Sequence, residues 1–135
     1  MALKGVKEMA DKKGEVSLSL PADREYVLLA RMALSGLGML AGLDVDLIDD
    51  LRTATDECCD CLLHQPAKAE RLEIRARVDA GRLYCCLNAV RSGGASDLPI
   101  NDLEITRGVL ETLMPDVTLE CDSCGVGSIG FSLPV

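Results

Sequence analysis

The stretch between residues 71 and 90 constrains the fold of this chain more than any other. Its first half alternates charged residues with apolar ones, which are Leu72, Ile74, Ala76 and Val78. A period of two residues is typical of a β-strand that is buried on one side only. The letters DAGR (79–82) indicate a turn, and the run LYCCLNAV (83–90) predicts a more apolar, central strand. The chain therefore needs a sheet that a second layer covers on one face.

Helical patterns supply that second layer. A strand at 15–20 ends at Pro21, and a helix is predicted from residue 24 to Gly42 with Asp23 as its N-cap. Asp44 is expected to cap a second helix that runs to about Gln65. A third helix is predicted over 102–114, and two last strands, 116–121 and 126–133, form a hairpin.

The order of these elements predicts the architecture. Strand, two helices, two strands, helix and two strands give an α+β, two-layer sandwich, with helices on one face of a mixed, mostly antiparallel sheet. A length of 135 residues favours one domain with one core. We expect residues 1–13 to be a loose N-terminal segment and residues 14–135 to form the single domain.

The faces of the predicted helices follow from their spacing. In the second helix an apolar stripe comprises Leu47, Leu51, Ala54, Cys58 and Leu62. Along the edge of this stripe lie Glu57, Cys61 and His64. In the third helix the apolar spacing is that of Ile105, Val109 and Leu113.

The overall composition argues against several classes of partner. A net charge of −8 and an aromatic content of 2% leave neither a basic stripe nor stacking platforms, so we expect no nucleic acid. No apolar run reaches the roughly 18 residues that span a bilayer, so we expect no membrane insertion. The first residues, MALKGVKEMADKKGE, carry charges where a signal peptide needs an apolar stretch. Seven cysteines, with two adjacent pairs, favour a reduced, cytoplasmic setting.

The stretch TDECCDCLLHQ (55–65) gathers three cysteines and the only histidine, which raises the question of a metal site. Zinc needs four such ligands, often in C-x-x-C pairs. Cys121 and Cys124 have that spacing, and Cys58, Cys61 and His64 are three residues apart on a helix. Cys58 also lies on the apolar stripe, where it is expected to be a small buried hydrophobic residue. Zinc at Cys121 and Cys124 remains an alternative.

Three other chemistries have weaker support in the pattern. Cys121 and Cys124 lie on a hairpin turn, without the helix N-terminus that lowers thiol pKa values in redox pairs. His64 lies at a helix C-terminus, where it is well placed to interact with the last carbonyls of the helix. Activation of Cys61 by His64 would need a third group to orient the histidine, and the sequence shows none. The SGG at 92–94 is too short for a phosphate-binding loop.

One long stretch resembles a known family. The run LPADREYVLLARMALSGLGMLAGLDVDLIDDLRTATDECCDCLL (20–63) is similar to the N-terminal half of anti-sigma-factor serine kinases, which are histidine-kinase-like (Bergerat-fold) ATPases. The similarity continues through VLETLMPDV (109–117), which resembles the helix after the last glycine box of the family. The resemblance implies helices on one face of a mixed sheet, in agreement with the order of elements above.

The resemblance also assigns the positions of a nucleotide pocket. Glu57 matches the glutamate that acts as catalytic base in the family, and Cys61 stands where an asparagine holds Mg²⁺. A thiol is a poor ligand for Mg²⁺, which prefers hard oxygen atoms. Ala89 and Arg91 replace the aspartate and glycine of the adenine box. Glu104 and Thr106 replace the two glycines of the phosphate box, where their side chains would obstruct phosphates.

These replacements lead to a ranked set of hypotheses. The first is a regulatory protein of the anti-sigma type that binds a sigma factor or a STAS-domain anti-sigma antagonist, commonly as a homodimer, with ATP binding lost. The second is an active ATP- and Mg²⁺-dependent serine/threonine kinase that uses Glu57, with Asp56 and Asp60 as substitute oxygen ligands through a shift of one residue. The third is a small zinc-binding domain.

Overall fold

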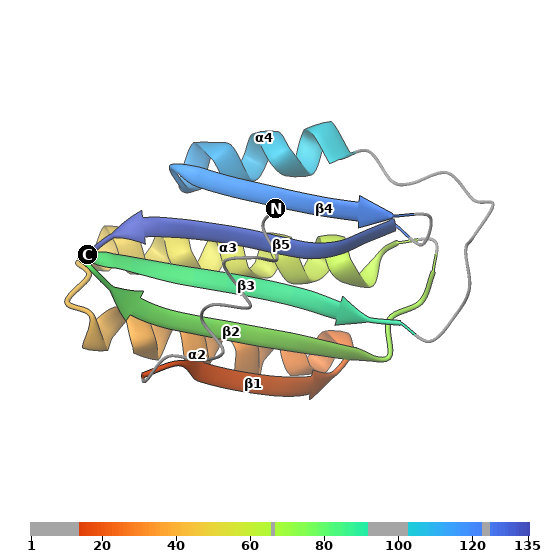
Figure 1. Ribbon diagram of the computed structural model, residues 1–135, viewed down its shortest axis with the longest axis horizontal. Helices are drawn as coiled ribbons and strands as arrows, with labels where there is room; N and C mark the ends of the chain where they lie inside the picture. Colours follow the sequence, from red (N-terminus) through yellow and green to blue (C-terminus); the bar gives the residue numbers. More distant parts are fainter. Residues whose placement is uncertain (1–13, 66, 92–102, 123–124) are drawn as a thin grey trace.

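The computed structural model describes residues 14–65, 67–91, 103–122 and 125–135, which form two layers (Figure 1). Strand β1 (Val16–Pro21) leads through the 3-10 turn η1 (Arg24–Tyr26) into helices α2 (Val27–Leu40) and α3 (Val45–Leu63). The hairpin of β2 (Arg71–Asp79) and β3 (Arg82–Val90) follows. Helix α4 (Leu103–Leu113) precedes the hairpin of β4 (Asp116–Asp122) and β5 (Gly125–Pro134). The expectation of a loose segment at 1–13 concerns residues outside the described ranges.

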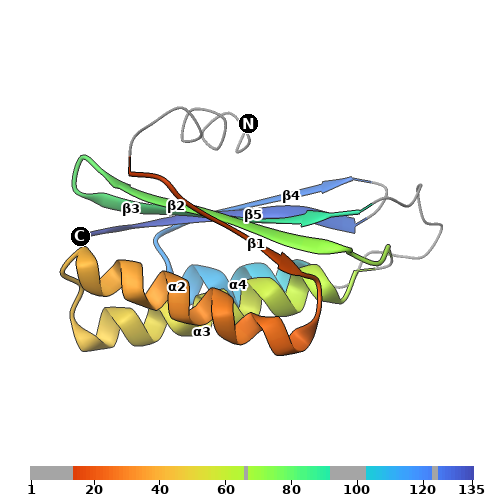
Figure 2. The same cartoon turned by 90° about the horizontal axis from the view of Figure 1, so that it is seen from below.

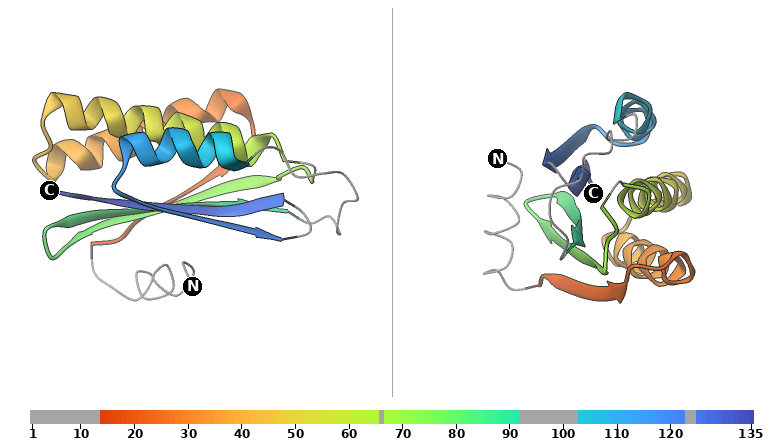
Figure 3. Two further views of the ribbon diagram at one scale, coloured as in Figure 1. Left: turned by 90° about the horizontal axis from the view of Figure 1, so that it is seen from above. Right: turned by 90° about the vertical axis from the view of Figure 1, so that its right-hand side faces the viewer.

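The five strands form one sheet in the order β1-β2-β3-β5-β4, and every neighbouring pair is antiparallel. The described helices all pack against one face of this sheet (Figure 2), so the predicted α+β sandwich is confirmed. The sheet was predicted to be mixed and mostly antiparallel, and among the described strands it is antiparallel throughout, so the mixed part of the prediction is wrong. The views along and across the strands show α2, α3 and α4 side by side in the second layer (Figure 3).

The core lies between the two layers and follows the period of each element. Each central strand turns every second residue toward the helices, and α3 buries one of its sides against these strand residues. The buried strand residues that follow this alternation are Leu72, Ile74 and Ala76 of β2, Leu83, Cys85, Leu87 and Ala89 of β3, and Ile129, Phe131 and Leu133 of β5. The buried residues of α3 include Leu51, Ala54, Cys58 and Leu62, as the apolar stripe predicted.

Several local predictions need correction. Asp23 makes no side-chain cap bond, because the chain forms a 3-10 turn before α2 begins at Val27. Leu47 is 36% exposed because it lies in the first turn of α3, and Val78 is 44% exposed at the end of its hairpin. Among the α4 residues whose burial the structure describes, Leu110 is buried, and Met114, directly after the helix, is buried as well. Both lie one position after the predicted stripe, and Ile105 is 65% exposed.

The prediction about the N-cap of α3 is confirmed, and a glycine explains how α2 packs against α3. The Asp44 carboxylate accepts a hydrogen bond from the Leu47 amide (2.9 Å), so Asp44 caps α3 as expected. A Cβ at Gly38 would lie 3.0 Å from Leu51 Cδ2 and 3.1 Å from Leu43 Cδ1. Gly38 therefore lets α2 approach α3 closely.

Candidate functional site

The C-terminal end of α3 is held by side chains. The last carbonyls of a helix have no amide partner within the helix. His64 Nδ1 lies 2.7 Å from the Asp60 carbonyl, Gln65 Nε2 donates to the Cys61 carbonyl (2.9 Å), and Arg91 Nη2 donates to the Leu62 carbonyl (3.0 Å). The predicted role of His64, an interaction with the helix end, is confirmed.

Arg91 joins this helix end to two other segments. Its Nε donates to the Ala67 carbonyl in the connection between α3 and β2, and its Nη1 donates to the Val126 carbonyl in β5, both at 2.7 Å. Since Arg91 directly follows β3, one half-buried side chain bonds to the backbone of three segments that are distant in sequence.

Gln65 adds a second link at the same place. Its Oε1 accepts a hydrogen bond from the Val126 amide (3.0 Å), while its Nε2 holds the Cys61 carbonyl. Gly125 makes room for this buried amide, because a Cβ there would lie 2.7 Å from Gln65 Oε1. The backbone of Gly125 also has φ +111°, a value that L side chains rarely adopt. The side chains of Gln65 and Arg91 therefore fill the space between α3 and the start of β5.

Cys61 lies on the side of α3 that faces α4. Burial raises the pKa of the Cys61 thiol, and a hydrogen bond with the Thr106 side chain and the charge of Arg91 act in the opposite direction. Thr106 and Glu104 lie within the helical backbone of α4. Ala89 is a buried core residue at the end of β3. The structure thus brings Cys61, Arg91 and Thr106 together.

Asp56 and Asp60 lie on the other side of α3, toward α2. Asp56 Oδ1 accepts from Arg31 Nε (2.9 Å) and Asp60 Oδ1 accepts from Arg24 Nη1 (2.7 Å). Successive helix residues are rotated by about 100°, so Asp56 and Asp60 are directed well away from Cys61. If Asp56 and Asp60 acted as the substitute oxygen ligands for Mg²⁺, the ion would lie on a different side of α3 from Cys61, Thr106 and Arg91.

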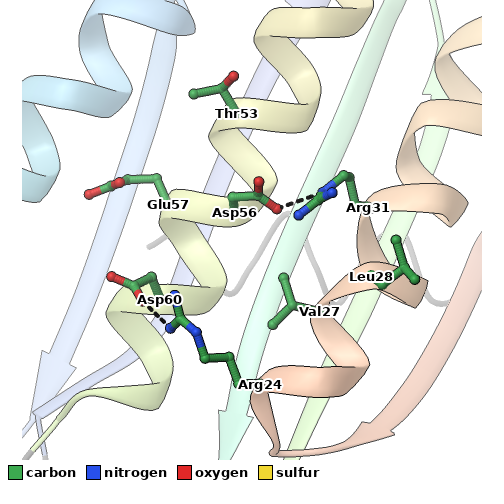
Figure 4. Close-up of a pocket in the computed structure, with 8 residues that line it drawn as sticks. All are labelled: Arg24, Val27, Leu28, Arg31, Thr53, Asp56, Glu57 and Asp60. Carbon is green, nitrogen blue, oxygen red and sulfur yellow. Dashed lines mark hydrogen bonds and ion pairs between the residues drawn. The ribbon is translucent and has the colours of Figure 1, made fainter.

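A groove of about 400 Å³ lies between α2 and α3 on the outer side of the helical layer. The two ion pairs Arg31–Asp56 and Arg24–Asp60 cross it, while Glu57 lies on its α3 side and points away from α2 (Figure 4). The remaining lining residues are Val27, Leu28 and Thr53. Glu57 is half-buried and lies at the rim of the groove, between the ion pairs on one side and Cys61 on the other.

The other cysteines divide into buried core residues and an exposed one. Burial raises the pKa of Cys59 to about 12 and raises the pKa values of Cys58, Cys85 and Cys86 as well. These thiols therefore stay neutral at ordinary pH and behave as small hydrophobic residues. Cys121 is exposed on β4.

The zinc hypothesis cannot be followed to its second ligand, because Cys124 lies outside the described residues. Among the residues that the structure describes, no group of three or more His, Cys, Asp or Glu side chains is arranged to hold a metal ion. In the same ranges, no helix is both long enough and apolar enough to cross a membrane.

Sequence reasoning missed Gln65 and the carbonyls that Arg91 contacts. Arg91 and Val126 are 35 positions apart, and Gln65 and Val126 are 61 apart, so no local period relates them. The available signals were an arginine at the end of an apolar strand and a glutamine directly after a helix.

Comparison with known proteins gives a consistent group of relatives, although no protein-family model matches the chain. A protein named serine-protein kinase RsbW from Listeria monocytogenes (strain EGD-e) is 31% identical, over 84% of each chain. A protein of the same name from Bacillus thuringiensis (strain Al Hakam) is 26% identical, over 84% of this chain and 82% of the relative.

Proposed function

Because the chain belongs to the family of the serine-protein kinase RsbW, we propose that it is a regulator of the anti-sigma type that acts by binding another protein, with nucleotide binding lost. The proposed partners are a sigma factor or a STAS-domain anti-sigma antagonist. A homodimer and a cytoplasmic location are parts of the same proposal.

One observation gives the main support for the proposed loss of nucleotide binding. At the position of the glycine in the family's adenine box, Arg91 extends a side chain that bonds to three main-chain carbonyls. A nucleotide would have to displace these bonds, and a hydrogen bond from a charged donor contributes roughly 1.5–3 kcal/mol. The nearby Ala89 offers no carboxylate to accept a hydrogen bond from the adenine amino group.

The positions that would hold Mg²⁺ and phosphates support the same conclusion. Cys61 is a buried neutral thiol next to Thr106, whereas Mg²⁺ requires oxygen ligands in a nearly octahedral arrangement. Glu104 and Thr106 belong to helix α4 and not to a glycine loop, and the charge of Glu104 would repel phosphate oxygens. The residues present do not fit Mg-ATP.

Isothermal titration with Mg-ATP tests this proposal directly. The wild-type chain should release no binding heat at concentrations where the Listeria relative, named as a kinase, serves as the positive control. Tight, magnesium-dependent binding to this chain would contradict the proposal.

The names of the relatives favour an active serine kinase as the second candidate. Glu57, the position of the family's catalytic base, is retained and half-buried at the groove rim. This candidate requires transfer of phosphate from ATP to a serine of the partner, and Glu57→Gln should abolish the transfer. Asp46→Asn is the control, since Asp46 is an exposed carboxylate in the first turn of the same helix and does not line the groove. If the wild-type chain transfers no phosphate to a sigma factor or STAS protein encoded beside it, the kinase reading fails.

The zinc-binding alternative stays a prediction for Cys121 and Cys124. Elemental analysis of protein purified without chelators decides it, because a structural site retains about one equivalent of zinc. A content below about 0.2 equivalents would rule the alternative out.

A further inference from the structure

The three carbonyls of Leu62, Ala67 and Val126 converge on a single guanidinium. Their distances to Arg91 Nη2, Nε and Nη1 are 3.0, 2.7 and 2.7 Å, so each of the three nitrogens has its own acceptor. A guanidinium presents five donors in one plane, whereas an ammonium presents three donors around a single atom. The arrangement therefore matches a planar cation with donors on several sides.

The backbone leaves these acceptors available for such a cation. Leu62 lies in the last turn of α3, where the helix itself supplies no amide for the carbonyl. The pairing of β3 with β5 ends at Asn88 and Ser128 and does not extend to Val126, which pairs with Cys121 of β4 on the other side. Arg91 continues the connection between the two strands through its side chain.

The electrostatics of the site also favour a cation. The C-terminus of a helix carries the negative end of the helix dipole, and a positive group there is stabilised. The Arg91 guanidinium lies against the end of α3, a helix with no basic residue in its last turn. The charge of Arg91 thus complements a helix end that the local sequence leaves without a cation.

We propose that these three carbonyls form a guanidinium-binding site and that Arg91 is its permanent internal ligand. Arg91 joins the ends of α3 and β3 to β5 in the place where the family resemblance puts a nucleotide. The ligand class of the site is a small planar guanidinium ion with three nitrogen donors, and neither an ammonium ion nor a nucleotide fits it. This inference goes beyond the proposed function, and the two are tested by different experiments. Binding of Mg-ATP to the wild-type chain would contradict the proposed function, whereas the experiments below test the guanidinium site.

Chemical rescue of Arg91→Ala is the first test. The substitution should lower the Tm by at least about 6 °C, because three hydrogen bonds from a charged donor are lost. Methylguanidinium should then raise the Tm of the variant in a dose-dependent manner by about 2 °C or more, while leaving the wild-type Tm unchanged. Methylammonium at the same ionic strength should have no such effect.

Arg82→Ala is the matched control, because Arg82 lies at the opposite end of β3 and donates to the Asp116 and Ser132 side chains near the surface. Methylguanidinium should not raise the Tm of that variant. Equal responses of the two variants, equal responses to the two cations, or no response of Arg91→Ala would each overturn the proposal.

A measurement on the wild-type chain covers the case in which Arg91→Ala does not fold. The Nε–H proton of Arg91 donates to a main-chain carbonyl beside a helix end, so its exchange with solvent, followed by NMR, should be at least about 10-fold slower than that of the exposed Arg24 Nε–H. Exchange of the two protons at the same rate would show that the guanidinium is not held.

Discussion

Gly125 is the residue at which a single methyl group should be most costly. Its φ of +111° is unfavourable for any L side chain, and holding a residue in such a conformation costs roughly 1–3 kcal/mol. The new Cβ would also lie 2.7 Å from Gln65 Oε1 and 2.9 Å from Gln65 Cβ. Overpacking of this kind costs roughly 1–3 kcal/mol. Gly125→Ala should therefore lower the free energy of unfolding by about 2–6 kcal/mol, a large part of the 5–15 kcal/mol typical of a domain.

Equilibrium unfolding in urea measures this cost, with Gly127→Ala as the control. Gly127 is two positions along the same strand, has no positive φ, and a Cβ there meets no atom within 4 Å. Its substitution should change the free energy of unfolding by less than about 0.5 kcal/mol.

A double-mutant cycle with Gln65→Ala measures how much the outer part of the Gln65 side chain contributes to the cost of Gly125→Ala. In the Gln65→Ala background the contact with Oε1 is gone, whereas the contact with the Cβ of residue 65 and the backbone strain remain, so Gly125→Ala should cost less than in the wild-type chain. The reasoning is refuted if Gly125→Ala and Gly127→Ala cost the same, or if removal of the Gln65 side chain leaves the cost of Gly125→Ala unchanged.

Three further predictions concern the cap, the thiols and the outer ion pairs. Asp44→Ala should lower the free energy of unfolding by about 1 kcal/mol in urea titrations, because the cap bond to the Leu47 amide is lost. Asp44→Ser should lower it much less, since serine is also a good N-cap, and equal losses in the two variants would argue against the cap. Burial raises the pKa of Cys59 from the usual thiol value of 9.0 to about 12 in the folded chain, so the stability that the neutral thiol contributes is complete below pH 9 and is lost as the pH rises toward 12. Urea titrations should show that decline, and a Cys59→Ala variant that declines equally would count against it. A double-mutant cycle on Arg24 and Asp60, whose side chains are 75% and 50% exposed, should give a coupling below about 1 kcal/mol, and a larger value would contradict a solvent-screened pair.

The sequence was sufficient where the structure depends on local patterns. The alternation in 71–78 predicted the buried face of β2 as far as Ala76, and Asp44 was recognisable as a cap from its place before an apolar helix. Asp23 has the same local chemistry as Asp44, but its helix begins after a 3-10 turn, so the cap does not form. The difference arises from the path of the backbone and not from the residue type.

The candidate site was less predictable, because its contacts join distant parts of the chain. The family resemblance identified Cys61, Ala89, Arg91 and Thr106 as positions of interest, but it could not say whether their side chains leave a cavity or fill it. In the structure Arg91 reaches carbonyls 24 to 35 positions away, and the sequence of those acceptors carries no signal because any residue has a carbonyl. Ile105 is exposed because α4 turns Leu110, one position after the predicted stripe, toward the core.

The central claim, that this chain regulates a partner by binding without using ATP, is tested most directly by measuring partner affinity with and without Mg-ATP. The partner is a sigma factor or STAS protein encoded beside the chain, and the complex is followed by titration calorimetry together with mass spectrometry of the partner's serines. The same Kd is expected under both conditions, with no phosphoserine on the partner. A change in Kd of more than about 10-fold, equivalent to 1.4 kcal/mol, or a stoichiometric phosphoserine on the partner, would contradict this claim.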